Sequence, residues 1–167
     1  MIQIIEQTLI LLKPDAIERG LIGRVIERFE NAGLKIIGMK MQWVDKAFAM
    51  KHYGEDIEKR RGAHVRQWLA EYLIEGPVIA FVLEGLHAVE IVRKICGPTE
   101  PRTAPAGTIR GDFALHSYSF ADKKKKAIRN LIHASANNQE AKQEIKLWFK
   151  PKELHSYETV AEKHLWK

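Results

Sequence analysis

The stretch Asn130–Ser135 (NLIHAS) decides how the rest of this chain is interpreted, because a short apolar run carries a histidine and then meets small residues. Asn137 follows, and Glu140 stands three positions later, at the spacing of a helix capping box. The pattern predicts a strand that carries His133 and a helix that begins directly after it. A helix start presents unpaired N–H groups and a partial positive charge, so it suits an anion. A histidine that only packs at a strand end is the ordinary alternative.

The predicted helix has small or apolar residues at helical spacing, at Ala141, Ile145 and Trp148. Glu144 precedes Ile145 by one position, where its carboxylate could fold back toward His133. A carboxylate that orients an imidazole is a common part of nucleophilic sites. This segment therefore predicts a site at the junction between a strand and a helix.

Working outward, further apolar runs predict three more strands, at Thr8–Leu12, Leu34–Val44 and Val78–Leu83. Gly38 is a candidate bulge within the second of them. Apolar residues at helical spacing predict four further helices, at Ile22–Phe29, Asp45–Tyr53, Val65–Leu73 and His87–Ile95. The segment Gly54–Gly62 is charged and aperiodic, which indicates a loop or a frayed helix.

The resulting order is β-α-β-α-α-β-α-loop-β-α, followed by a tail after Pro151. It predicts an α/β (α+β) sandwich of ferredoxin-like βαββαβ type, with helices packed on one face of a mostly antiparallel four-stranded sheet and with added helices. The segment Pro98–Gly111 is rich in proline and glycine, and such a long ordered loop is usually functional. With 167 residues, the chain fits one domain over residues 1–167.

The net charge of +6 predicts an anionic ligand or partner, either a phosphorylated small molecule or a nucleic acid. The run Lys123–Lys126 fits a solvated surface insertion first and a nucleic-acid patch second. The single Cys96 and the absence of metal-type Cys/His spacing favour a reducing compartment. The sequence has no signal pattern at its N-terminus and no membrane-spanning apolar run, so we expect a cytoplasmic protein without a membrane partner.

Several groups at strand ends and in loops together suit phosphoryl transfer, which needs cations and donors around the phosphoryl oxygens and a nucleophile held in line. These groups are Lys13, Tyr53, Arg93, Thr99, Arg110, Asn130, His133 and Glu144. The two commonest nucleotide-binding signatures, G-x-x-x-x-G-K-[ST] and G-x-G-x-x-G, are absent. A histidine nucleophile would make the reaction a two-step transfer through a phosphohistidine.

Several stretches of this chain resemble the nucleoside diphosphate kinase family, in the family's order and over nearly the whole length. They are Thr8–Arg19 (TLILLKPDAIER), Gly20–Phe29 (GLIGRVIERF), His52–Tyr53, Gly76–Pro77, Pro105–Phe113 (PAGTIRGDF), Asn130–Ser135 (NLIHAS) and Glu144–Phe149 (EIKLWF). The resemblance implies Mg²⁺-dependent, ping-pong transfer of the γ-phosphate from a nucleoside triphosphate to a nucleoside diphosphate. It also implies a homo-oligomer, either a hexamer or a tetramer.

The resemblance also implies roles for individual residues. His133 would be the phosphorylated nucleophile, Glu144 would orient its ring, and Ser135 would lie beside it. The remaining residues would hold the nucleotide: Lys13 and Asn130 near the ribose hydroxyls, Arg93, Thr99 and Arg110 on the phosphates, and Tyr53 in the same site. Ala136 stands where the family usually has an acidic residue, so Mg²⁺ would be held mainly by the nucleotide's own phosphates.

The chain departs from the family's common form in two insertions, near residues 54–64 and 117–126. Both lie where the family contacts the base, for which His64, Val65, Trp68 and the region near Ser117 are candidates. Two other classes of function stay open. A nucleic-acid-binding or regulatory protein on the same fold would suit the basic charge, and a silent structural subunit would not require the catalytic-type residues.

Overall fold

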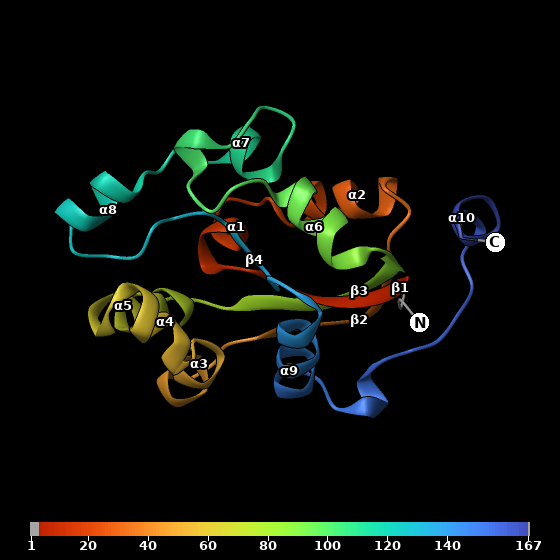
Figure 1. Cartoon of the computed structure of the whole chain (residues 1–167), viewed down its shortest axis with the longest axis horizontal. Coiled ribbons are helices and arrows are strands. Elements are labelled where there is room, and N and C mark those ends of the chain that lie inside the picture. Colours follow the sequence, from red (N-terminus) through yellow and green to blue (C-terminus); the bar gives the residue numbers. More distant parts are fainter. Residues whose placement is uncertain (1–3, 167) are drawn as a thin grey trace.

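The computed structural model describes residues 4–166, and it contains a four-stranded antiparallel sheet in the order β2-β3-β1-β4 (Figure 1). The strands are β1 (Ile5–Leu12), β2 (Lys35–Gln42), β3 (Val78–Leu86) and β4 (Ile132–Ala134). This order is that of the ferredoxin-like fold, which confirms the fold class expected from the sequence. Gly38 lies at a register shift between β2 and β3, so the predicted bulge is also confirmed.

The helices are α1 (Pro14–Glu18), α2 (Ile22–Asn31), α3 (Lys46–His52), α4 (Glu55–Arg61), α5 (Ala63–Leu73), α6 (Ala88–Cys96), α7 (Ile109–Phe113), α8 (Tyr118–Lys123), α9 (Asn138–Trp148) and α10 (Val160–Leu165). Within residues 4–166, the five helices expected from the sequence are present as α2, α3, α5, α6 and α9, and five further helices, most of them short, are added. Two 3₁₀ turns lie at Pro101–Thr103 and Pro151–Glu153. None of the helices within residues 4–166 combines the length and the apolar character that crossing a membrane requires.

Helices cover both faces of the sheet, which corrects the expectation of a single covered face (Figure 1). In β1, Ile10 and Leu12 belong to a core with α2 and α6, whereas Leu9 and Leu11 belong to a second core with α3, α5 and α9. The expectation holds for α2 and α6, the helices of the βαββαβ unit. The added helices take the opposite face, because a strand as apolar as β1 must be buried on both sides.

The segment expected to be a loop or a frayed helix forms the regular helix α4, although none of its residues is buried. Glu55, Asp56 and Glu58 occupy its first turn, and basic residues occupy its last turn. This arrangement complements the helix dipole, and Asp56 pairs with Arg60 one turn later. Electrostatics therefore stabilise a helix that has no apolar stripe, which explains why periodicity did not indicate it.

Strand register decides which way the histidine of β4 faces. Leu11 of β1 lies opposite His133, and residues opposite one another in antiparallel strands share a face. His133 therefore faces the layer that contains α3 and α9. A slip of one residue would turn its imidazole toward α2 and α6 instead.

The capping pattern after β4 is present in a modified form. Asn137 accepts a hydrogen bond from the backbone N–H of Glu140 at 2.9 Å and so begins α9. The Glu140 carboxylate accepts from the N–H of Ala136 at 3.1 Å, one residue before the cap. This cap fixes the start of α9 and thereby the position of Glu144, two turns further along the same helix.

Candidate active site

A strained turn precedes the histidine. Leu131 is fully buried and has a φ of 68°, and the N–H of Ile132 donates to the carbonyl of Asn130 at 2.7 Å, which closes a γ-turn. The backbone N–H of Lys13 donates to the carbonyl of Leu131 at 2.8 Å. The backbone N–H of Leu131 donates to the Asp15 carboxylate at 3.3 Å. A buried, left-handed leucine of this kind is costly, and such strain clusters at functional sites.

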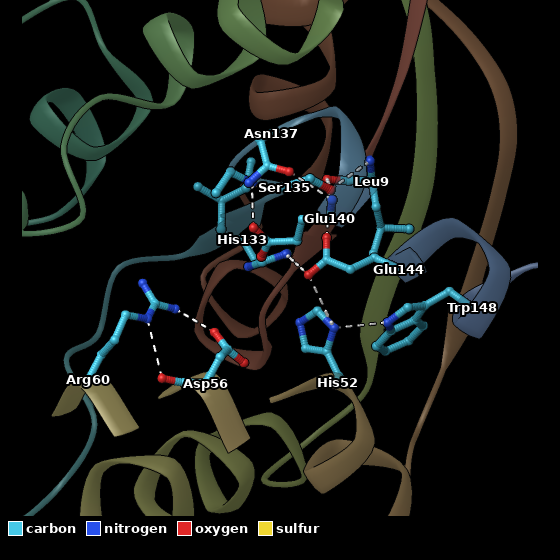
Figure 2. Close-up of polar contacts among 12 residues, drawn as sticks. Leu9, His52, Asp56, Arg60, His133, Ser135, Asn137, Glu140, Glu144 and Trp148 are labelled. Carbon is cyan, nitrogen blue, oxygen red and sulfur yellow. Dashed lines mark hydrogen bonds and ion pairs between the residues drawn. The ribbon is translucent and has the colours of Figure 1, made fainter. Parts of the chain in front are cut away.

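Figure 2 shows His133, Glu144 and Ser135 as one connected group. The Nε2 atom of His133 lies 2.7 Å from Oε1 of Glu144. The Ser135 hydroxyl donates to Oε2 of the same carboxylate at 2.5 Å and accepts from the backbone N–H of Leu9 at 3.3 Å. Ser135 is fully buried, so it links the carboxylate rigidly to β1.

The charge of Glu144 decides which nitrogen of His133 is free. Burial alone would raise the pKa of Glu144, but His133, His52 and the Ser135 hydroxyl together lower it to about 2. The carboxylate is therefore ionised at neutral pH and accepts a proton-bearing nitrogen. The neutral imidazole of His133 then carries its proton on Nε2, which leaves Nδ1 with a free lone pair.

Lys13 and Asn130 form a buried pair beside this group. The Nζ of Lys13 donates to Oδ1 of Asn130 at 2.8 Å and lies 4.8 Å from the centroid of the Tyr72 ring. Asn130 in turn donates to the carbonyl of Thr99 at 3.0 Å. Burial, with a further contribution from nearby Arg110, lowers the pKa of Lys13 to about 7.

Arg110 is a second buried cation, and it is bound by carbonyls rather than by a carboxylate. Its guanidinium donates to the carbonyls of Ile132 at 2.6 Å, Gly97 at 2.7 Å and Asn130 at 3.3 Å. Burial lowers its pKa, although a guanidinium stays charged. Arg110 thus joins the Pro/Gly-rich loop to β4 and keeps an uncompensated positive charge there.

A cleft of about 280 Å³ opens beside His133, with α8 on one side of it and α4 and α5 on the other (Figure 1). Among the described residues that line it, the cations outnumber the acids. The cations are Lys13, Arg60, Arg61, Arg93, Arg110 and Lys126, and the acid is Asp122. A concave surface of this charge attracts anions.

The structure brings most of the residues predicted from sequence into this cleft: Lys13, Tyr53, Arg93, Thr99, Arg110, Asn130 and His133 line it. Ser135 and Glu144 do not line it and lie behind the His133 ring instead. The Tyr53 hydroxyl is buried and has no hydrogen-bond partner among the described residues. Burial raises the pKa of Tyr53 well above its usual range, so the phenol is neutral and can still donate to a ligand.

Sequence reasoning missed Arg60 and Arg61, which reach the cleft from α4. Arg60 pairs with Asp56 at 2.6 Å, and Arg61 donates to the Tyr118 hydroxyl of α8 at 3.2 Å. The two inserted segments therefore meet across the cleft. The charge pattern of α4 was the available signal, because it predicts a helix that would present its basic last turn.

Of the candidates for base contacts, some line the cleft and others do not. Val65 and Trp68 line the cleft, whereas His64 packs against Trp68 with ring centroids 4.9 Å apart. Ser117 caps α8 by accepting from the N–H of Phe120 at 3.2 Å and is not part of the lining. Tyr118, the next residue, lines the cleft in its place.

His52, His133 and Glu144 have the spacing of a metal site, since their ligand atoms lie within 4.8 Å of one another. These atoms already interact, because Nε2 of His133 contacts Glu144 and Nδ1 of His52 accepts from the indole N–H of Trp148 at 3.3 Å. A cation would have to displace both interactions. The group therefore fits an orienting network better than a metal centre.

The comparison with known proteins agrees with the geometry of this site. A family model described as Nucleoside diphosphate kinase matches residues 6–154. The chain belongs to the nucleoside diphosphate kinase family. It is 50% identical over 157 residues to the nucleoside diphosphate kinase of Pyrococcus horikoshii, and these cover 94% of this chain and 93% of the relative. It is 46% identical over 155 residues to that of Borreliella burgdorferi, which cover 92% and 93%.

Solved structures of the nucleoside diphosphate kinase family have the same fold. The enzyme from Borrelia burgdorferi, described as a transition-state mimic with bound vanadate and ADP, aligns with a TM-score of 0.96 and 44% identity over 98% of both chains. The halophilic enzyme from Halobacterium salinarum, in complex with CDP, aligns with a TM-score of 0.83 and 33% identity over 97% of this chain and 99% of that one.

The structure shows which group lies at Ala136, where the resemblance leads us to expect an acidic residue. The carboxylate of Glu140 folds back from α9 to the backbone N–H of Ala136. Burial first, and then repulsion from Glu144, raises the pKa of Glu140. A carboxylate is therefore present near this position, although it comes from another residue.

We predict that Ser135→Ala weakens the kinase fold by loosening Glu144. The ionised Glu144 contributes stability that is present above its unfolded pKa of 4.5 and is lost as the pH falls toward 2. Without the serine donor, the folded pKa of Glu144 rises, so this loss is complete at a higher pH. The free energy of unfolding at neutral pH should fall by about 1–3 kcal/mol, measured by urea denaturation.

Ser156→Ala is the matched control, because it makes the same chemical change at an exposed position. It should leave the free energy of unfolding within about 0.5 kcal/mol of the unmodified protein. Equal effects of the two substitutions would contradict the structural role assigned to Ser135.

Proposed function

We propose that this chain transfers the terminal phosphate of a nucleoside triphosphate to a nucleoside diphosphate through a phosphohistidine on His133. The observation that carries the proposal is the 2.7 Å contact between Nε2 of His133 and Glu144, at the wall of a cationic cleft. That contact leaves Nδ1 of His133 unprotonated, as a nucleophile requires.

In the first half-reaction, Nδ1 of His133 attacks the terminal phosphorus and forms an N–P bond. The bond from that phosphorus to the bridging oxygen breaks, and the nucleoside diphosphate leaves. Phosphorylation makes the imidazole cationic, and Glu144 stabilises that charge because it stays ionised beside Nε2. In the second half-reaction, a terminal phosphate oxygen of another nucleoside diphosphate attacks the phosphorus and the N–P bond breaks.

The cations of the cleft supply electrostatic stabilisation of the transferring group. We assign Arg93, Arg110 and Thr99 to the phosphates, and we assign Lys13 and Asn130 to the ribose hydroxyls. Tyr53 offers an unpartnered buried hydroxyl in the same cleft. Charge on the phosphoryl oxygens would then be matched by fixed donors without reorganisation at the moment of transfer.

We expect Mg²⁺ as the cofactor, carried mainly by the phosphates of the nucleotide. The donor set fits this arrangement, since Nε2 of His133 already contacts Glu144, Nδ1 of His52 already accepts from Trp148, and most of the charged groups that line the cleft are cations. Mg²⁺ commonly keeps its waters and binds through phosphates in such sites. It would neutralise phosphate charge when bound.

We also propose self-association and a cytoplasmic location. Strand β2 lies at the edge of the sheet, and Met39 and Met41 on it and Trp43 directly after it are exposed at alternating positions. An apolar edge strand of this kind suits pairing with a second copy of the chain. The buried free thiol of Cys96 suits a reducing compartment.

The run Lys123–Lys126 bears on the alternative of nucleic-acid binding. It begins at the last residue of α8 and continues beyond the helix, and Lys126 is part of the cleft lining. A basic rim beside a nucleotide site raises the rate of capture of anionic substrates, which accounts for the charge without a second partner. We therefore retain the kinase as the function of this chain.

The first prediction of this proposal concerns labelling. Incubation with γ-labelled ATP and Mg²⁺ should place label on the chain, stable to alkali, labile in acid and released by GDP. His133→Ala should abolish the label and lower kcat by more than about 10⁴-fold. His116→Ala, which changes another half-buried histidine outside the cleft lining, is the control and should label normally. Label retained by His133→Ala would refute the assignment of the nucleophile.

The second prediction concerns a proton. With a pKa of about 7, Lys13 is largely neutral at about pH 8, and an anionic nucleotide favours its charged form. Binding of ADP at about pH 8 should therefore take up a proton, and affinity should fall as the pH rises above 7. Calorimetry in two buffers of different ionisation heat measures this uptake. Lys13→Arg, whose guanidinium stays charged, should bind without it; equal uptake would place the proton elsewhere.

The third prediction concerns the oligomer. Met41→Lys places a charge in the exposed apolar row of β2 and should lower the mass measured by sedimentation. Leu115→Lys changes an exposed apolar residue away from β2 and should leave the mass unchanged. If Met41→Lys keeps the mass of the unmodified protein, β2 is not the contact.

A further inference from the structure

One buried imidazole next to the nucleophile has no role in the mechanism described above. His52 ends α3, and its side chain is completely buried. Its ring centroid lies 4.6 Å from that of His133, with the two ring planes 86° apart (Figure 2). His52 does not line the cleft, so it contacts the nucleophile from behind and does not meet the substrate.

The partner of His52 fixes its protonation. The indole N–H of Trp148 lies 3.3 Å from Nδ1 of His52, and an indole nitrogen can only donate. Nδ1 must therefore accept, which places the single proton on Nε2 and leaves the ring neutral. Nε2 has no hydrogen-bond partner within residues 4–166.

The charged and titratable groups that face His52 come from three elements and the end of β1. They are Tyr53 directly after α3, Glu144 on α9, His133 on β4 and Lys13 directly after β1. Burial, and then repulsion from His133, lowers the pKa of His52 to about 3 despite the attraction of Glu144. The environment thus opposes a charge on this ring, in agreement with the hydrogen bond from Trp148.

The same carboxylate oxygen lies close to both imidazoles. Oε1 of Glu144 is 2.7 Å from Nε2 of His133 and 3.6 Å from Nδ1 of His52. If the single proton of the neutral His52 ring moved to Nδ1, that nitrogen would become a donor aimed at the same carboxylate oxygen. It would then compete with His133 for Oε1, and charge-assisted bonds of this kind are the strong ones. The Trp148 N–H occupies the nitrogen where that proton would bind.

We propose that His52 and Trp148 are positioning residues for the phosphoryl transfer, with the Trp148 N–H keeping Nδ1 of His52 unprotonated so that Oε1 of Glu144 remains available to His133. The neutral His52 ring also packs perpendicular to the His133 ring and limits its rotation. This inference depends on the proposed function, because it concerns the orientation of a phosphorylated histidine.

The test is the rate of phosphoenzyme formation, measured by rapid quench with γ-labelled ATP and Mg²⁺ at about pH 8. Trp148→Phe keeps an aromatic ring but removes the donor, so the single proton of the neutral His52 ring can move to Nδ1 and compete with His133 for Oε1 of Glu144. The rate of the variant should be roughly tenfold lower than that of the unmodified protein. An unchanged rate would overturn the proposal.

His52→Phe supplies a second variant that separates positioning from packing. The phenyl ring keeps an aromatic side chain beside His133 but has no N–H that could compete for Oε1 of Glu144. The double variant His52→Phe with Trp148→Phe should therefore recover most of the rate lost in Trp148→Phe. No recovery in the double variant would assign the loss to packing and would refute the proposal.

Phe48→Leu is the matched structural control, because Phe48 packs against Trp148 with ring centroids 4.8 Å apart and leaves its N–H untouched. It should reduce stability without lowering the rate of phosphoenzyme formation; a rate loss equal to that of Trp148→Phe would indicate loose packing alone and count against the proposal. Failure of the unmodified protein to label at all would instead contradict the proposed function. The two failures are therefore distinguishable.

Discussion

The 2.7 Å contact between Nε2 of His133 and Oε1 of Glu144 is the interaction on which the rest of this site depends. It joins β4 to α9, and each end has its own support. Asn137 fixes the start of α9, and Ser135 connects the carboxylate to β1. Leu11 of β1 lies directly opposite His133, so the imidazole faces the same side of the sheet as Leu11, toward α9. The reactive nitrogen is thus selected by register, capping and one buried hydroxyl acting together.

The buried cations of the cleft oppose the stability of the fold, and neutral hydrogen-bond acceptors bind them in place of carboxylates. Lys13 and Arg110 are almost completely buried, and burial opposes the charge on both. A carboxylate partner would stabilise them but would also cancel the positive charge that phosphates need. Asn130 and several backbone carbonyls bind these cations instead. The site is therefore less stable than it would be if each cation were paired with a carboxylate. The strained backbone of Leu131, in the turn that includes Asn130, lowers the local stability further.

Much of this arrangement could be predicted from the sequence, and the exceptions have physical causes. The strands, the cap at Asn137 and the return of Glu144 toward His133 follow from local spacing, and the structure confirms them. The helix α4 was expected only as a loop or a frayed helix, because charge pairing rather than an apolar stripe stabilises it, and Arg60 was missed with it. The second covered face of the sheet was also missed, because periodicity within a strand does not show which helices pack on each side.

The sequence by itself determined the order of the elements, the chemical groups available and the family. These depend on local spacing and on motifs made of contiguous residues. Only the tertiary structure decided that Nδ1 of His133 is the free nitrogen and that His52 lies behind it, held by Trp148. These features depend on contacts between residues far apart in the chain. Strand register and helix packing create such contacts, and no local pattern specifies them.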